Sequence, residues 1–193
     1  MRVDKQIMYH ISRENNWNVG DRITAGIEDN PFWLACINYS PKVSINNHVM
    51  SIHEMINKKI VFDVSQQSID FLYKNLEDVS KEFSFFVREQ VFEEYRKTYF
   101  PNLPSRQKCL WTTEADQLPY WETMSPNTPR KLLTLELAGE LFCADEHWLT
   151  ADTFSATTYL ERAQHYWSGD MSSSPIKEYL FVGTALVKGI QSI

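Results

Sequence analysis

The stretch Ile176-Lys-Glu-Tyr-Leu-Phe-Val182, near the C-terminus, alternates as a β-strand does. This alternation places Glu178 on the same face as Leu180 and Val182, and Tyr179 on the opposite face. A carboxylate among aliphatic side chains is either paired with a partner, desolvated for chemistry, or not inward-facing at all. On this stretch alone a structural role for Glu178 is the simpler interpretation, and two other stretches favour a catalytic one.

Size and composition indicate an ordinary globular chain. The 193 residues suffice for one domain with a substantial core, so we expect a single domain over residues 1–193. The hydrophobic fraction is 43% and the charged fraction 23%, which is typical of soluble proteins. A net charge of -6 argues against broad nucleic-acid binding by counterion release.

Sequence features that would indicate export or metal binding are missing. Neither a secretory leader nor an apolar run of about 20 residues is present, so we expect a cytoplasmic protein without membrane contact. The three cysteines, Cys36, Cys109 and Cys143, lie far apart and are expected to be buried, reduced and apolar in role. The histidines have no metal-ligand spacing, so no metal site is predicted.

Helical periodicity is clearest over Ser65–Tyr99, which predicts one long helix, or two with a bend near Ser84, packed on one side of the strands. Ser65 or Ser68 is the expected N-cap. The charged run Glu93-Glu94 with Arg96-Lys97 predicts a solvated face. A second helix is expected over 153–167, capped by Asp152 or Thr153, and a short one over 114–124.

Alternating patterns predict the strands. In chain order, the predicted strands are Lys5–Ser12, Lys108–Thr113, Lys131–Leu137, Gly139–Cys143, Ile176–Val182 and Leu186–Ile190. Gly139–Cys143 either continues the preceding strand or forms a hairpin with it. Gly183 is expected to turn the chain between the last two strands. Residues 101–106 and 169–175 read as loops, and residues 30–60 give no clear pattern. The fold class predicted is α+β, with a split, mostly antiparallel β core and flanking helices.

Three motifs, in this order, resemble the ADP-ribosyltransferase superfamily, in particular its His-Tyr-Glu class that includes diphtheria toxin and poly(ADP-ribose) polymerases. The first is Tyr9-His-Ile-Ser-Arg13, followed by Asn15-Asn16 and Gly20. The second is Leu110-Trp-Thr-Thr113, running into a helix with Tyr120. The third is Lys177-Glu-Tyr-Leu-Phe181. The whole chain also resembles a bacterial family of unknown function with a Tyr-His start, a Pro-Ser-Arg middle and a terminal Glu strand.

The resemblance implies a mono-ADP-ribosyltransferase that takes NAD as its substrate and releases nicotinamide. Glu178 would be the catalytic residue, because a carboxylate near the ribose stabilises an oxocarbenium-like transition state. The residues implied to bind NAD are His10, Ser12, Arg13, Arg106, Tyr120 and Trp121. Among them, His10 would bind a ribose, an aromatic ring would stack on nicotinamide, and the arginines would hold the pyrophosphate. The three strands that carry the motifs, Lys5–Ser12, Lys108–Thr113 and Ile176–Val182, would then line one cleft.

Two positions depart from the motifs. Ile11 stands where the class has a glycine that offers its backbone to nicotinamide, and Gln117 stands where a serine is usual. Spacing leaves open whether Tyr120 or Trp121 is the stacking ring.

The acceptor of ADP-ribose is expected to be a macromolecule, protein or nucleic acid, in the manner of a toxin or phage-defence component with an antitoxin or regulatory partner. The alternative is a catalytically inactive module of the same fold that binds nucleotides or proteins. An RNA 2′-phosphotransferase is a third candidate, which the acidic composition disfavours. An unpaired, buried carboxylate costs stability, so an inactive relative would have no reason to keep Glu178.

Overall fold

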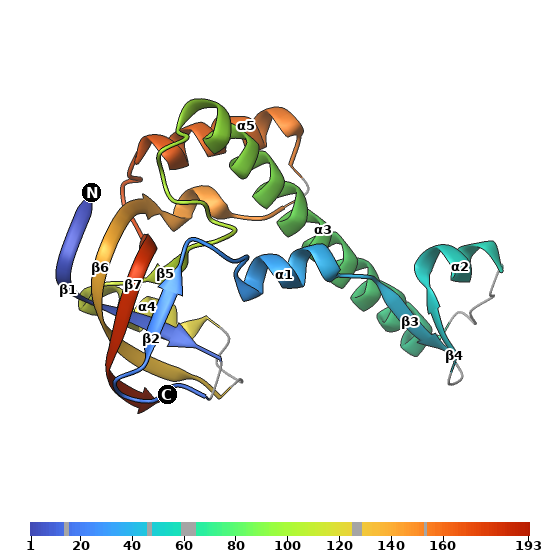
Figure 1. Ribbon diagram of the computed structural model, residues 1–193. Helices are drawn as coiled ribbons and strands as arrows, with labels where there is room; N and C mark the ends of the chain where they lie inside the picture. Colours follow the sequence, from blue (N-terminus) through green and yellow to red (C-terminus); the bar gives the residue numbers. More distant parts are fainter. Residues whose placement is uncertain (14–15, 46–47, 59–64, 125–128, 153) are drawn as a thin grey trace.

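The computed structural model describes residues 1–193 except 14–15, 46–47, 59–64, 125–128 and 153. Its main sheet has the strand order β1-β6-β7-β2, with β5 also paired to β7, and every pairing between these strands is antiparallel (Figure 1). Helices cover one side of the sheet. The prediction of an α+β protein with a mostly antiparallel sheet is confirmed.

The described elements, in chain order, are β1 Arg2–Ser12, β2 Arg22–Ala25, α1 Pro31–Asn38, β3 Lys42–Ile45, β4 His48–Ser51, α2 Ile52–Asn57, α3 Gln66–Tyr99, β5 Leu110–Thr112, η1 Ala115–Gln117, α4 Leu118–Thr123, β6 Lys131–Asp145, η2 Glu146–Leu149, α5 Ala156–Ser168 and β7 Lys177–Ser192. The α5 helix begins later than predicted. Its N-cap is Ser155, whose hydroxyl accepts from the Thr158 amide, and not Asp152; Thr153 lies outside the described residues.

The two long strands β6 and β7 correct the prediction of shorter strands. Gly139–Cys143 continues the preceding strand, and Gly183 does not turn the chain but lies inside β7, directly opposite Gly139. Gly183 has a φ of 142°, and a Cβ there would lie 2.4 Å from the Ala138 carbonyl oxygen. Glycine is needed at this point because the two backbones approach closely, and a mid-strand glycine is easily mistaken for a turn.

Both faces of β7 are buried, each in its own core. Tyr179 and Phe181 pack with the leucines of β6 on one face of the sheet. Leu180 packs on the other face with Tyr166 and Trp167 of α5. The alternation predicted for Ile176–Val182 is therefore confirmed, and it directs Glu178 toward the helices.

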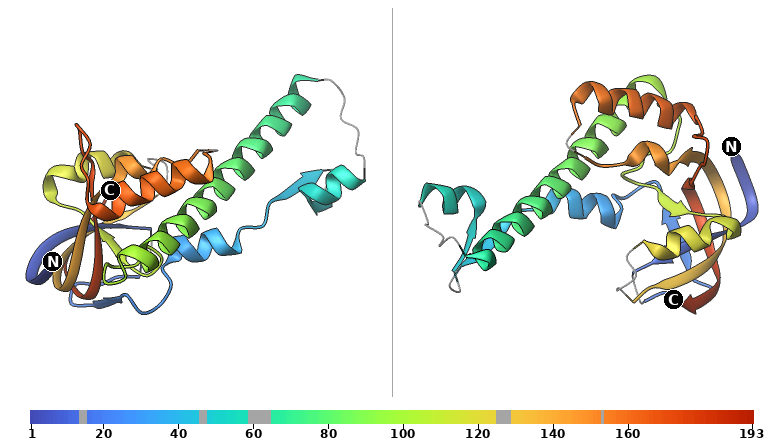
Figure 2. Two further views of the ribbon diagram at one scale, coloured as in Figure 1. Left: turned by 90° about the horizontal axis from the view of Figure 1, so that it is seen from above. Right: turned by 180° about the vertical axis from the view of Figure 1, so that it is seen from behind.

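The α3 helix is one continuous helix, capped at its start by Ser65. Its C-terminal half packs against α5, where the Trp167 indole donates to the Phe92 carbonyl at 2.8 Å. Its N-terminal half extends away from the sheet toward β3, β4 and α2, which form a small unit at the far end (Figure 2). The helix is thus packed on one side of the strands only along its second half.

Candidate functional site

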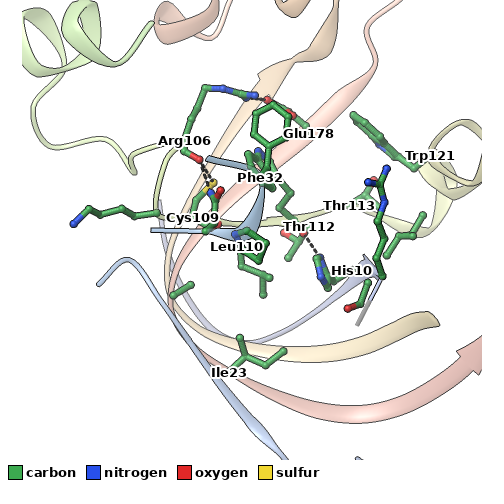
Figure 3. A pocket seen from close by; sticks show the side chains of 18 of the residues that line it. His10, Ile23, Phe32, Arg106, Cys109, Leu110, Thr112, Thr113, Trp121 and Glu178 are labelled. Carbon is green, nitrogen blue, oxygen red and sulfur yellow. Dashed lines mark hydrogen bonds and ion pairs between the residues drawn. The ribbon is translucent and has the colours of Figure 1, made fainter. Parts of the chain in front are cut away.

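A pocket of about 710 Å³ opens between the sheet and the helices (Figure 3). Residues of β1, β5 and β7 line it together, among them His10, Thr112 and Glu178. The β5 strand pairs with β7, and Tyr9 bridges Thr113, so the three strands are direct neighbours. The prediction that these strands line one cleft is confirmed.

Glu178 lies at the start of β7 and is 5% exposed. Its Oε1 accepts hydrogen bonds from Arg106 Nη1 and from the Tyr166 hydroxyl. No other described residue donates to Glu178, so Oε2 has no hydrogen-bond partner within the described part of the chain. The carboxylate is therefore anchored by one oxygen, while its side chain lines the pocket.

Arg106 holds Glu178 from the loop before β5, and Glu89 of α3 holds Arg106. The Nε and Nη2 atoms of Arg106 donate to the two oxygens of Glu89 at 3.1 and 3.2 Å, a bidentate pair. Burial opposes the charge of Arg106, yet Glu178 and Glu89 outweigh it and raise the pKa of Arg106 above its usual value. The guanidinium of Arg106, predicted to hold pyrophosphate, is already bound by Glu89 and Glu178. Arg106 is therefore placed to position Glu178.

Glu89 also pairs with a second arginine, Arg88 of the same helix. Arg88 Nη2 donates to Glu89 Oε1 at 2.7 Å. Burial raises the pKa of Glu89, but Arg106 and Arg88 together lower it below its usual value, so this 1%-exposed carboxylate stays charged. The cluster contains two arginines and two glutamates, which balance in charge.

The next turns of α3 correct the expected solvated face. Glu94 and Lys97 are exposed as expected, but Glu93 is 3% and Arg96 9% exposed. They form a salt bridge of 2.8 Å, and Arg96 Nη1 also donates to the carbonyls of Pro101 and Leu103. The loop that leads to Arg106 folds back over these charges, which is why a charged run is buried here.

His10 presents a hydrogen-bond acceptor. Its Nδ1 lies 2.8 Å from the Trp111 carbonyl oxygen, and because a carbonyl only accepts, Nδ1 carries the proton. Burial lowers the pKa of His10, although the bond to Trp111 works against this shift. In the neutral ring Nε2 therefore has a lone pair, for which no described residue is a partner.

The other predicted residues of the first motif also line the pocket. Ser12 is buried there, and Arg13 is exposed. Ile11, which replaces a glycine of the motif, lines the pocket too.

The two rings of α4 lie differently relative to the pocket. Trp121 lines the pocket, and its indole donates to the Lys177 carbonyl at 3.2 Å. Tyr120 is not among the lining residues, and its hydroxyl donates to Glu146 Oε2 at 3.1 Å. Gln117, the second departure, accepts from the Lys177 amide and so ties α4 to the start of β7.

Sequence reasoning missed three residues of the site: Tyr166, Glu89 and Glu146. Tyr166 and Glu89 lie in helical patterns where nothing marks them. Glu146 had a weak signal, since it follows a buried strand directly, in the polar run Asp145-Glu146-His147. It lines the pocket as a second carboxylate.

Within the described ranges no group of three or more His, Cys, Asp or Glu side chains is placed to hold a metal ion. A separate check of the helices, over the same residues, finds none long and apolar enough to cross a bilayer. Cys36 and Cys109 are buried and Cys143 is partly buried, and all three are free.

Comparison with known proteins gives a family. A search of curated proteins finds no match. A family model matches residues 8–193, which include every residue of the pocket described above. The chain therefore belongs to the DUF2441 family of proteins of unknown function.

Proposed function

We propose that this protein is a mono-ADP-ribosyltransferase that cleaves the nicotinamide glycosidic bond of NAD and transfers ADP-ribose to an acceptor. The observation that carries the proposal is that Glu178, His10 and Trp121 line one pocket (Figure 3). These residues come from β7, β1 and α4. Glu178 and His10 belong to motifs by which the sequence resembles the His-Tyr-Glu class, and Trp121 is the neighbour of the motif tyrosine Tyr120.

The environment of Glu178 suits this chemistry. Glycosidic cleavage develops positive charge on the ribose, and a fixed carboxylate in a water-poor site stabilises that charge. Arg106 and Tyr166 hold Oε1, so the carboxylate does not have to reorganise as the charge develops. Oε2 remains for a ribose hydroxyl.

The rest of the pocket suits NAD in size and in chemistry. Small-molecule sites are commonly about 300–1,000 Å³, and this pocket has about 710 Å³. His10 Nε2 would accept from a ribose hydroxyl, and the Trp121 indole would stack on nicotinamide. Arg13 would hold the pyrophosphate. Strands β1, β5 and β7 would correspond to the three motif strands of an ADP-ribosyltransferase-like fold.

A non-catalytic module of the same fold is the second candidate, and the pairing of Glu178 favours it. The expectation that an inactive relative would lose Glu178 assumed a carboxylate without a partner. Glu178 has two partners, and its ion pair with Arg106 gives a structural reason to retain it. Such a module would bind NAD or a related nucleotide without cleaving it, and would act through a protein or nucleic-acid partner.

The test is Glu178→Gln, which keeps the size of the side chain and removes its charge. Under the proposal, nicotinamide release falls by about 10²–10³-fold, while NAD affinity changes little, because the charge develops mainly in the transition state. Nicotinamide release by chromatography and NAD binding by calorimetry are measured on the same sample.

Glu140→Gln is the matched control, since Glu140 is an exposed glutamate on the neighbouring strand β6. Its release rate should equal that of the parent. Parent protein that binds NAD without releasing nicotinamide would favour the non-catalytic module. Unchanged release in Glu178→Gln would remove Glu178 from catalysis.

A further inference from the structure

A second carboxylate, that of Glu146, lies beside Glu178. Ala144 of β6 pairs with Glu178 of β7, and the Glu146 amide continues this ladder by donating to the Ile176 carbonyl at 2.8 Å. Glu146 is therefore a diagonal neighbour of Glu178 at the end of the β6–β7 pairing, on the same face. Both residues line the pocket.

The two carboxylates have different surroundings. Glu178 is ion-paired with Arg106, whereas the only described hydrogen-bond partner of the Glu146 side chain is the Tyr120 hydroxyl, on Oε2. Burial raises the pKa of Glu146 and Glu178 raises it further, while the bond from Tyr120 opposes the shift. The titratable and charged groups that face Glu146 come from every element around it: Tyr120, Glu178, Arg88, Arg106 and Arg162.

We infer that Glu146 is the general base that takes the proton of the incoming nucleophile, while Glu178 stabilises the ribosyl cation. This inference rests on the proposed function. In the step, the bond between ribose C1′ and the nicotinamide nitrogen breaks, and its electron pair leaves with neutral nicotinamide. The nucleophile forms a new bond to C1′, and its proton passes to the Glu146 carboxylate.

The placement of the two groups supports this division of labour. Two carboxylates in environments that differ in this way are a common basis for separate electrostatic and proton-transfer roles. In inverting glycosidases the carboxyl groups stand about 6.5–9.5 Å apart, which leaves room for a nucleophile. Glu146 and Glu178 likewise line one pocket, in which a nucleophile could bind between them.

The inference also defines the class of acceptor. A general base is useful only for a nucleophile that carries a proton, such as a hydroxyl, an amine or water. A carboxylate acceptor needs no base, and Glu146 and Glu178 would repel it. The acceptor is therefore a hydroxyl or nitrogen group and not an acidic side chain.

The experiment compares Glu146→Gln with the parent in full-length protein, using NAD with water and then with sodium azide as the nucleophile. Azide is an anion that needs no proton removed. Nicotinamide release into water should fall by about 10²–10⁴-fold in Glu146→Gln. Azide should restore release in this variant and yield ADP-ribosyl azide, detected by mass spectrometry. Azide should not restore Glu178→Gln, because the cation is still unstabilised there.

Glu161→Gln, at an exposed position of α5, is the control and should behave as the parent. Parent-like release into water by Glu146→Gln would overturn the inference and leave the proposed function standing. Lost release that azide does not restore would also overturn it, by showing a structural role. Parent protein that releases no nicotinamide with either nucleophile would overturn the proposed function, and this inference with it.

Discussion

At the scale of single residues, His10 and Glu178 share one arrangement. Each uses one polar atom to bind the protein and has a second atom without a described partner: Nε2 of His10 and Oε2 of Glu178. The bonded atom fixes the orientation of the side chain, and for His10 it also fixes the tautomer. A ligand entering the pocket would meet groups that are already oriented.

His10 provides a pH-dependent prediction. Its pKa in the folded protein lies below the ordinary value of 6.5 because burial disfavours the charged ring. A depressed pKa contributes stability above the unfolded value, and that contribution is lost as the pH falls through the folded value. Between about pH 7 and pH 5, the parent should therefore lose more stability than His10→Asn, whose amide can still donate to the Trp111 carbonyl.

Urea unfolding at the two pH values measures this difference. The exposed His53, replaced by Asn in the same way, is the control for a histidine substitution outside the pocket. Equal losses of stability in the parent and in His10→Asn would contradict the burial of a neutral His10.

At the scale of elements, the C-terminal turns of α3 hold a buried ionic network. Its last four turns carry Arg88, Glu89, Glu93 and Arg96 inward, where each is paired. Removing one member of a buried ionic network leaves the others unpaired, although the intact network adds little net stability over an apolar core. The value of these charges lies in holding the loop that delivers Arg106 to Glu178.

Glu89→Gln tests this role. The substitution leaves the buried Arg88 with a neutral partner and leaves Arg106 with Glu178 as its remaining carboxylate. The free energy of unfolding should therefore fall by about 3–5 kcal/mol. Glu94→Gln, on the exposed side of the same helix, should change it by less than about 0.5 kcal/mol. Both are measured by urea denaturation, and equal effects of the two substitutions would show that the Glu89 cluster does not support the fold.

At the scale of the whole molecule, the pocket is assembled from elements far apart in the sequence, while the distal unit of β3, β4 and α2 stands away from it (Figures 1 and 2). The N-terminal half of α3, which leads to that unit, exposes Leu72, Tyr73 and Leu76, the last at 65%. The buried residues of α3 begin only at Ser84. The two halves of one helix therefore have very different support.

Hydrogen exchange should reveal this difference. All amides of α3 beyond the first turn are in one helix, but the free energy of local opening depends on tertiary packing. Amides over 70–80 should exchange much faster than those over 88–99, as measured by mass spectrometry of peptides from the two halves. Uniform protection along α3 would mean that the N-terminal half is covered by another surface in solution.

The sequence alone determined the features that depend on local periodicity. Alternation placed Glu178 on the face of β7 that turns to the helices, and the spacing of apolar residues predicted α3 with Ser65 as its cap. Short local motifs also identified His10 and Glu178 as candidates, with Tyr120 or Trp121 as the ring beside them.

Only the tertiary structure decided which partners those residues have. Three findings depend on segments that are distant in the chain: β7 continues through Gly183, Glu93 and Arg96 are buried, and Glu89 pairs with Arg106. The choice of Trp121 over Tyr120 as the pocket-lining ring is of the same kind. A charge is stable in the interior only if another segment supplies its counter-charge, and no local pattern records where that segment will fold.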